Sequence, residues 1–381
     1  MAQACRLIEV WGSPYERGVQ YGRQAAAEIA RAAAHYGTQI KRLNLTDQRF
    51  IEIIEKYLPL IEKFDALYVE EMRGIAAGSG VRFEEVVLIN ARTEVVQLAL
   101  HPEWLGLIGP SEGCTSVVVR PSATRDKQLI HAHNWDWELP CAEFSVILKV
   151  RNTDKPDILT YTEAGALGRF GMNSRGICVT GNGLECDRDY RKLGVPVGLL
   201  RRKALEQTYL ALAQRDVYET PKSGSTNVVI SHGPSGLVHD FECAPDETFI
   251  VTDQDGILVH SNHWLSPIAL IKLRETGIGS APTTLYREQL TREALTAKRG
   301  DITIEDVKAA LLDDFETPWS ICYPQRPADK GIVYITVATL LMRPDRGEMQ
   351  VCMLPALDEK KSFTTYSLEM DGPGTSSASH G

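Results

Sequence analysis

The chain has 381 residues, of which 43% are hydrophobic, enough for one large domain or two ordinary ones around a substantial core. Its formal net charge of −9 is spread along the sequence and is not collected in a basic stripe or a charged tail. We therefore expect no nucleic-acid partner and no membrane partner.

The first residues, from Met1 to Glu9, lack a basic segment followed by an apolar run, and about eighteen consecutive apolar residues occur nowhere. We expect a cytoplasmic protein on these grounds. The eight cysteines have no CxxC spacing, and most lie in apolar runs typical of strands. We expect reduced core thiols, with Cys114 as the exception.

The first 113 residues have the pattern of helices. A capping box with proline at the first helical position, Ser13-Pro14-Tyr15-Glu16, predicts a helix that begins there. Apolar residues then recur at helical spacing over about 47–76 and about 83–98. We expect residues 1–113 to form a mostly helical N-terminal segment.

After Gly113 the pattern changes to short β-rich runs, separated by turn residues at roughly ten-residue spacing. These predicted strands are 115–120, 128–133, 144–150, 158–162, 177–180, 225–231, 237–242, 248–252 and 257–260. Helical patterns return at about 195–213, 284–297 and 303–313, and a last hairpin is predicted over 332–354. Residues 371–381 are rich in Gly, Ser and Thr and are expected to be a disordered tail. The order predicts an α+β architecture in which helices cover sheet faces.

Cys114 is the most informative residue, because it follows Gly113 at the start of a predicted strand and precedes Thr115 and Ser116. A thiol attacks an amide well only as the thiolate, so a nucleophilic cysteine needs a base. Cleavage of the bond between Gly113 and Cys114 would create an α-amino group, whose pKa of about 8 suits that role. Glycine can adopt strained conformations that turn its carbonyl toward the thiol. These residue types alone are more typical of a buried, inert cysteine, and a self-cleaving precursor is the alternative that they leave open.

Four motifs occur in one order along the chain: Gly113-Cys114-Thr115-Ser116, His133-Asn134-Trp135-Asp136, the run from Thr162 to Gly176, and Val259-His260-Ser261-Asn262-His263. Together they resemble the acyl-coenzyme A:6-aminopenicillanic acid acyltransferase family. This is the isopenicillin N acyltransferase type of autoprocessing N-terminal nucleophile (Ntn) hydrolase. The similarity extends to Gly12–Gly22, Leu88–Glu94 and Trp319–Cys322.

The resemblance implies the four-layer αββα sandwich of Ntn hydrolases and a cut between Gly113 and Cys114. Residues 1–113 would become a small subunit, and residues 114–370 the β-rich catalytic subunit. The implied activity is that of a cysteine enzyme that hydrolyses or transfers the acyl groups of small-molecule N-acyl amides or acyl thioesters. No metal and no resident cofactor are implied, and acyl-coenzyme A is a candidate co-substrate.

The resemblance also implies roles for other residues. Asp136 is expected to hydrogen-bond the new amino group, although it could be a strand-end turn residue. Asn262 and Asn182 are expected to donate to the oxyanion that forms on the attacked carbonyl, although Asn182, between two glycines, could be a turn residue. Trp135 is expected to pack beneath the site.

One position departs from the family pattern. The family has an arginine directly after the Ser-Ile-Cys segment, where this chain has Tyr323, with Arg326 three residues later. We take Arg326 as the stand-in and expect it to affect a substrate-carboxylate contact.

Three alternatives remain open at this stage. The first is a strict amidohydrolase of the penicillin V acylase or bile-salt hydrolase type. The second is a non-catalytic Ntn-fold module that binds small molecules. The third is a metallohydrolase, because His131 and His133 alternate onto one strand face near Asp136 and such N and O sets suit metals.

Overall fold

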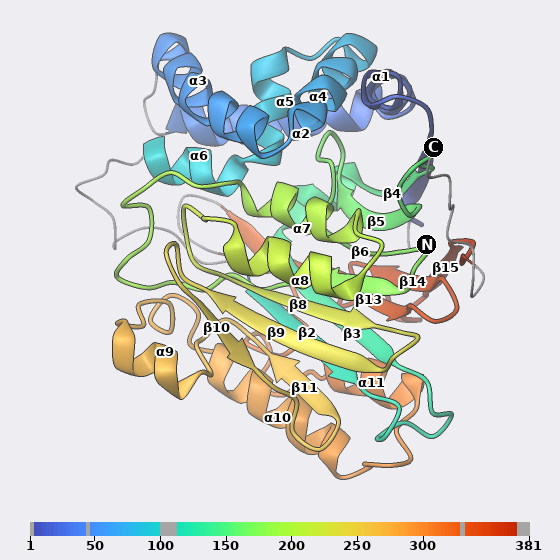
Figure 1. Ribbon diagram of the computed structural model, residues 1–381. Coiled ribbons are helices and arrows are strands. Elements are labelled where there is room, and N and C mark those ends of the chain that lie inside the picture. Colours follow the sequence, from blue (N-terminus) through green and yellow to red (C-terminus); the bar gives the residue numbers. More distant parts are fainter. Residues whose placement is uncertain (1–3, 43–45, 100–112, 328–331, 372–381) are drawn as a thin grey trace.

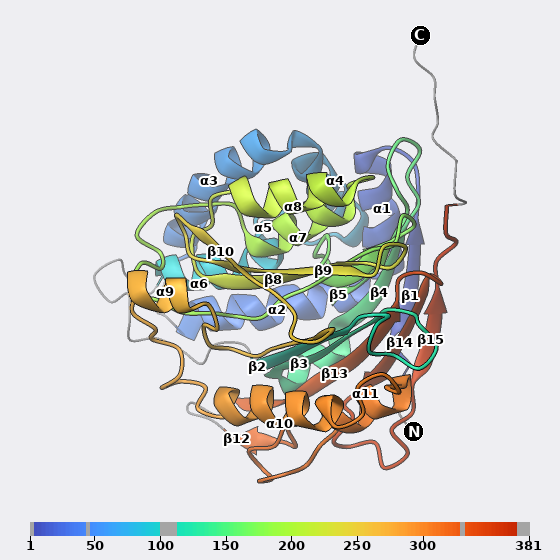
Figure 2. The same ribbon diagram turned by 60° about the horizontal axis from the view of Figure 1, so that its bottom comes forward.

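The computed structural model describes residues 4–42, 46–99, 113–327 and 332–371. Two β-sheets lie face to face, and helices pack outside each of them (Figure 1, Figure 2). These layers confirm the predicted α+β fold with the four-layer αββα arrangement. The predicted tail, 371–381, lies outside the described residues except for Asp371.

The N-terminal segment is largely helical, as predicted, and its first element is a strand that the sequence did not predict. Its elements are β1 (Arg6–Val10), α1 (Pro14–Gln24), α2 (Ala26–Arg42), α3 (Asp47–Phe64), α4 (Ala66–Ser79), α5 (Phe83–Asn90) and α6 (Arg92–Ala99). The capping box at Ser13 is present.

The two ranges with helical spacing, 47–76 and 83–98, are each helical, as predicted, and each holds two helices. Between α3 and α4, Asp65 has extended backbone, and its side chain accepts a hydrogen bond from the Leu67 amide, capping α4. Between α5 and α6, Ala91 leaves helical geometry.

The first sheet, sheet A, has eight strands in the order β1-β4-β5-β6-β7-β8-β9-β10. Only β1 with β4 is a parallel pair; the other neighbours are antiparallel. The strands after β1 are β4 (Ser145–Val150), β5 (Ile158–Glu163), β6 (Phe170–Asn173), β7 (Ile177–Thr180), β8 (Thr226–His232), β9 (Leu237–Cys243) and β10 (Thr248–Val251). The N-terminal segment thus contributes an edge strand to the sheet of the C-terminal part.

The second sheet, sheet B, has the order β11-β2-β3-β13-β14-β15, with β12 paired to β13 beside this path. Its strands are β2 (Gly113–Val119), β3 (Ile130–Glu138), β11 (Ile257–His260), β12 (Arg326–Pro327), β13 (Val333–Arg343), β14 (Glu348–Met353) and β15 (Thr364–Ser367). All its pairs are antiparallel. The predicted hairpin over 332–354 corresponds to β13 and β14.

Helices cover both outer faces of the sandwich (Figure 2). On sheet A lie α7 (Val197–Leu205) and α8 (Leu210–Glu219), and on sheet B lie α10 (Thr284–Thr296) and α11 (Ile304–Leu311). The 3-10 helix η2 (Leu139–Phe144) follows β3, and α9 (Pro267–Lys272) follows β11. In the described part of the chain, no helix is both long and apolar enough to cross a bilayer.

Strand β2 is buried on both faces, so its apolar residues run nearly continuously. Val117 and Val119 pack with Leu295 and Leu311 of the helices outside sheet B. Val118 points the other way and packs with apolar residues between the sheets. This two-residue alternation turns Cys114 and Ser116 toward sheet A and Thr115 toward α10.

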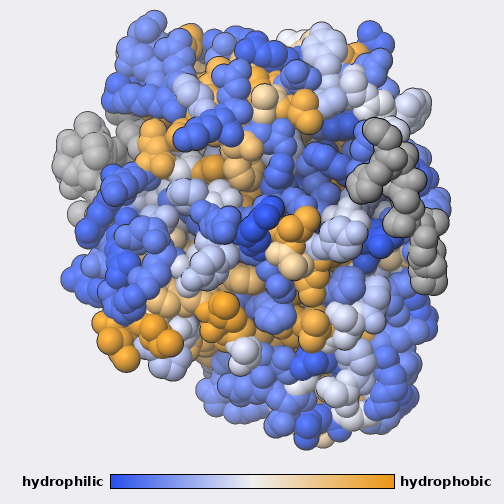
Figure 3. Space-filling model, viewed as in Figure 1, coloured by the Kyte–Doolittle hydropathy of each residue, from blue (hydrophilic) through white to orange (hydrophobic). Residues whose placement is uncertain are grey.

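The surface is mostly hydrophilic, and apolar side chains gather over α9 (Figure 3). Ile268, Leu270 and Ile271 of this short helix are exposed. Apolar residues that occur singly on a surface are ordinary, but three on one short helix form a small patch.

Helices α1 and α4 cross with their backbones in contact, because each has two glycines one turn apart at the crossing. A Cβ atom on Gly18 would lie 2.1 Å from the Glu71 carbonyl oxygen, and one on Gly74 would lie 2.2 Å from the Tyr15 carbonyl oxygen. Gly22 and Gly78 have similar contacts. No side chain fits between these helices without moving them apart.

The substitution Gly74→Ala should lower the free energy of unfolding by about 1–3 kcal/mol, because its methyl group overpacks the crossing. The control is Gly37→Ala in α2, where nothing lies within 4 Å of an added Cβ. That change should be neutral or stabilise by up to about 1 kcal/mol through helix propensity. Urea denaturation of both variants measures the difference, and equal effects would contradict the packing argument.

Candidate active site

The Gly113–Cys114 bond lies at the start of β2, between β11 and β3. Cys114 is fully buried and pairs with Trp135, and Gly113 pairs with Asp136 across the antiparallel ladder. A Cβ on Gly113 would lie 2.7 Å from the Asp136 Cβ and 3.0 Å from its Oδ2. Glycine is therefore needed at 113 for the backbone to approach the aspartate this closely.

Asn262 holds the backbone nitrogen of Cys114. Its Oδ1 accepts a hydrogen bond of 2.9 Å from the Cys114 amide, and its Nδ2 donates one of 3.0 Å to the Gly183 carbonyl oxygen. The Asn262 backbone amide donates to Thr284 Oγ1 at 2.6 Å, which ties this segment to the start of α10. The structure thus brings together the two motifs that contain Cys114 and Asn262.

Arg287 of α10 completes this group, and the sequence interpretation missed it. Its Nη1 donates to the Cys114 carbonyl oxygen at 2.7 Å and to Thr115 Oγ1 at 2.9 Å. Its Nη2 donates to Asn262 Oδ1 at 2.7 Å. One signal could have found it: Thr284, Arg287 and Leu295 share the buried face of α10, where an arginine is unexpected.

Asp136 lies on β3 directly beside Gly113. Its Oδ1 accepts a hydrogen bond of 2.6 Å from the Thr336 hydroxyl, and its Oδ2 is buried with no hydrogen-bond partner among the described residues. Burial raises the pKa of Asp136 to about 6, against the opposing effects of Arg287, the Thr336 bond and Arg326. A buried carboxylate with a raised pKa and a vacant oxygen is typical of functional sites.

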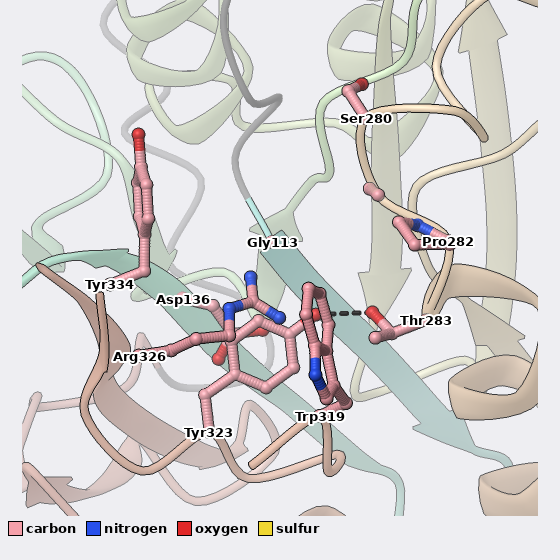
Figure 4. Close-up of a pocket in the computed structure, with 10 residues that line it drawn as sticks. Gly113, Asp136, Ser280, Pro282, Thr283, Trp319, Tyr323, Arg326 and Tyr334 are labelled. Carbon is pink, nitrogen blue, oxygen red and sulfur yellow. Dashed lines mark hydrogen bonds between the residues drawn. The ribbon is translucent and has the colours of Figure 1, made fainter. Parts of the chain in front are cut away.

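Arg326 lies on β12 at a pocket that reaches Gly113 and Asp136. The pocket is lined by Gly113, Asp136, Ser280, Ala281, Pro282, Thr283, Trp319, Tyr323, Arg326 and Tyr334 (Figure 4). The guanidinium carbon lies 4.2 Å from the Trp319 ring centroid and 4.4 Å from that of Tyr323. Its Nη1 is buried with no hydrogen-bond partner in the described structure.

Asn182 lies between the two sheets, and both polar atoms of its side chain are engaged there. Its Oδ1 accepts from Ser116 Oγ at 2.6 Å, and its Nδ2 donates to the His260 carbonyl oxygen at 2.9 Å. Asn182 therefore adjoins β2 two residues beyond Cys114. The Asn182 and Asn227 backbones exchange two hydrogen bonds. This pair extends the β7–β8 ladder by residues beyond the end of β7.

The histidines of β3 are bound to hydroxyl groups between the sheets. His131 contacts Ser231 and Thr180, each at 2.7 Å, and His133 Nδ1 lies 2.9 Å from Ser116 Oγ. Burial lowers the pKa of His131 to about 3. Among the described residues, no group of three or more His, Cys, Asp or Glu side chains could hold a metal ion.

Trp135 is fully buried next to Cys114 in the ladder. Its ring lies 5.8 Å from Tyr161 in an edge contact, and the Arg169 guanidinium carbon lies 4.6 Å from its centroid. The ring therefore packs beneath the site, where the sequence interpretation placed it. All eight cysteines are described, and all are buried.

The layered fold and the polar residues around Cys114 define the class of protein, a four-layer αββα sandwich with an enzyme-like site. No protein-family model matches the chain. Its sequence is 29% identical over 258 residues to the 40 kDa form of acyl-coenzyme A:6-aminopenicillanic-acid acyltransferase of Emericella nidulans. The aligned part covers 67% of this chain and 68% of that protein. The chain is therefore similar in sequence to an acyltransferase of the isopenicillin N acyltransferase type, the type that its motifs resemble.

Solved structures with partial similarity include a conjugated bile acid hydrolase variant from Clostridium perfringens, with 12% identity and a TM-score of 0.46 over 69% of this chain and all of that chain. The N-acylethanolamine-hydrolyzing acid amidase ortholog of Caenorhabditis elegans has 14% identity and a TM-score of 0.44, over 67% of this chain and all of that one. Penicillin V acylase of Agrobacterium tumefaciens has 13% identity and a TM-score of 0.43, over 64% of this chain and 83% of that one.

The buried Asp136 gives the site a measurable effect on stability. Its folded pKa is raised from 3.8 to about 6, so the native state holds the proton more tightly than the unfolded chain. The contribution of Asp136 to the free energy of unfolding is therefore largest below pH 4 and falls as the pH rises to 6. In a Cys114→Ala background, Asp136→Asn should gain about 1–3 kcal/mol over the parent at pH 7.5 and little at pH 4. Urea denaturation at both pH values measures this, and a gain that does not depend on pH would contradict the raised pKa.

Proposed function

We propose that this protein is a self-cleaving cysteine enzyme that hydrolyses or transfers the acyl groups of small-molecule amides or thioesters. The observation that carries the proposal is the arrangement at the start of β2. The nitrogen and the carbonyl of Cys114 are both held by side chains from other elements, Asn262 and Arg287. An N-terminal nucleophile needs its amino group fixed, and here both anchors are side chains that approach from segments far along the chain.

The proposed processing step breaks the bond between Gly113 and Cys114. The Cys114 sulfur bonds to the Gly113 carbonyl carbon while the C–N bond breaks and the nitrogen gains the thiol proton. Water then hydrolyses the thioester, which releases the Gly113 carboxylate and restores the thiol. The chain is divided into the 1–113 and 114–381 fragments, and the latter begins with a free α-amino group.

The proposed acyl-transfer step uses this amino group as the base. It accepts the thiol proton as sulfur attacks the substrate carbonyl, and the proton then goes to the departing amine or thiolate. Asn262 lies next to Cys114, and we assign it the oxyanion donor, whereas Asn182 supports the strand through Ser116. Asp136 Oδ2 lies beside Gly113 and has no hydrogen-bond partner among the described residues, so we assign it as the acceptor for the new ammonium or amino group.

The acyl-enzyme is resolved by water or by an acceptor amine, and the relative of this chain is an acyltransferase by name. The balance depends on how well the pocket excludes water and orients an amine. Incubation with penicillin V, or with phenylacetyl-coenzyme A and 6-aminopenicillanic acid, separates free acid from newly formed amide. We propose no resident cofactor, with acyl-coenzyme A as a donor co-substrate; the cytoplasmic location stays a prediction.

Arg326 is the candidate for recognising a carboxylate on the amine side of the substrate. Its guanidinium lies against two aromatic rings, and its Nη1, at the pocket that reaches Gly113, has no hydrogen-bond partner among the described residues. Guanidinium groups bind carboxylates with charge-assisted hydrogen bonds. The substrate class favoured by this pocket is an N-acyl compound whose amine part is anionic.

Freshly purified wild-type protein should run as two fragments on a denaturing gel, and Cys114→Ala should run as one. N-terminal sequencing of the larger wild-type fragment should begin with Cys-Thr-Ser. The Cys178→Ala variant is a matched control, since it removes another buried thiol that lies in sheet A, and it should still be cleaved. A wild-type chain that stays intact would instead support the small-molecule-binding module.

The substitution Arg326→Gln should raise KM about tenfold or more for N-phenylacetylglycine and leave kcat nearly unchanged, because a charge-assisted bond is lost on binding. N-phenylacetylglycinamide, which lacks the carboxylate, serves as the matched substrate and should show little change. Equal effects on both substrates would show that Arg326 does not bind the substrate carboxylate. Steady-state release of phenylacetate measures all four combinations.

A further inference from the structure

Arg287 carries a buried charge that has no direct carboxylate contact among the described residues. Its side chain is completely buried, and the nearby acid Asp136 acts on it only through longer-range attraction, with no ion pair between them in the described structure. Its hydrogen bonds go to neutral oxygens, those of Cys114, Thr115, Asn262 and Thr283. A buried charge of this kind costs stability unless something else is gained, so a purely structural role is a poor explanation.

The contacts of Arg287 fix the geometry around Cys114. Asn262 Oδ1 accepts from both Arg287 Nη2 and the Cys114 nitrogen, at 2.7 and 2.9 Å. Because only the oxygen of an amide can accept two such bonds, the Asn262 side chain is held in one orientation with Nδ2 directed at the Gly183 carbonyl. The other terminal nitrogen of the same guanidinium, Nη1, donates to the Cys114 carbonyl oxygen.

We propose that Arg287 is a positioning residue for the nucleophile: it holds the Asn262 amide and the Cys114 backbone in register, and its positive charge keeps the released α-amino group neutral and able to act as the base. The inference rests on the proposed function, because that amino group exists only after cleavage. It extends the function by assigning this role to a residue outside the four motifs.

The electrostatic part follows from the shared acceptor. The Cys114 nitrogen and Arg287 Nη2 bind one oxygen atom, so a protonated amine would face a positive charge at close range. A fixed positive charge lowers the pKa values of both the amine and the thiol, whichever proton leaves first. The other charged or titratable groups around this point come from several elements: Asp136 of β3, His263 after β11, Arg326 of β12 and Arg169 before β6.

The test compares Arg287→Met, Arg287→Lys and Arg292→Met. Arg292 is a matched control on the same helix: it donates to the Val259 carbonyl oxygen at 3.0 Å and pairs with Glu288, so its loss disturbs the same helix–sheet contact. Two readouts are used, the rate of conversion of precursor to fragments and the pH midpoint of Cys114 alkylation by iodoacetamide in the processed protein, followed by peptide mass. Neither readout requires the natural substrate.

In Arg287→Met the alkylation midpoint should rise by about one pH unit, because the nearby charge is gone. In Arg287→Lys the midpoint should stay near that of wild type. Conversion of precursor to fragments should slow about tenfold, because lysine cannot donate to the Cys114 carbonyl and to Asn262 Oδ1 in the geometry of a guanidinium. Arg292→Met should keep the wild-type midpoint. A wild-type midpoint in Arg287→Met overturns the proposal.

If Arg287→Met does not accumulate as processed protein, the conversion rate of Arg287→Lys tests the positioning role. A wild-type conversion rate in Arg287→Lys overturns that role. Wild-type protein without a new Cys114 terminus refutes the proposed function, and with it this inference. Processed wild-type protein whose Arg287 variants behave like Arg292→Met refutes this inference alone.

Discussion

The site depends on the antiparallel pairing of β2 with β3 on one side and β11 on the other. This pairing places Gly113 against Asp136 and Cys114 against Trp135, and it brings the segment after β11 alongside the Cys114 nitrogen. Because β2 is interior to the sheet and covered on both faces, its first residues have little freedom. A shift of one residue would exchange the directions of Cys114 and Thr115 and dismantle the arrangement.

The same region retains polar groups that a stability-optimised core would lack. Asp136 Oδ2, Trp135 Nε1 and Arg326 Nη1 are buried without hydrogen-bond partners among the described residues, and Arg287 is a buried charge. Each such group costs stability. The cost is offset by apolar packing on either side of the same strands, between the sheets and under α10 and α11. This uneven distribution is typical of sites retained for chemistry rather than for stability.

The sequence was a good guide where local pattern and motif order carry the information. Strand alternation and turn spacing predicted the β-rich core, and the motifs predicted that Cys114, Asp136 and Asn262 would belong to one site, where the structure brings them together. Arg287 was missed because its contact with Cys114 spans 173 residues and depends on how α10 packs on sheet B. The location of Asn182 between the sheets depends in the same way on sheet-on-sheet packing.

Strand β1 and the break at Asp65 were missed for different reasons. The short strand β1 acquires its identity only by pairing with β4, about 140 residues away in the chain, and local propensity contains little of that information. At Asp65 the helical spacing of apolar residues continues from α3 into α4, so this spacing alone does not show where one helix ends. The Asp65 side chain caps the start of α4 and separates the two helices.

The parallel pairing of β1 with β4 determines what the proposed cleavage would do to the N-terminal part. Five consecutive residues, Arg6–Val10, are in register with the C-terminal part of the chain, and Tyr36 and Arg92 are bonded to Glu163 on its β5. A leader peptide that is removed seldom forms a strand in the β-sheet of the mature protein. Under the proposed cleavage, the N-terminal fragment would instead remain bound as one subunit of a two-chain molecule with one-to-one stoichiometry. It could not exchange for another copy without unfolding of the C-terminal fragment.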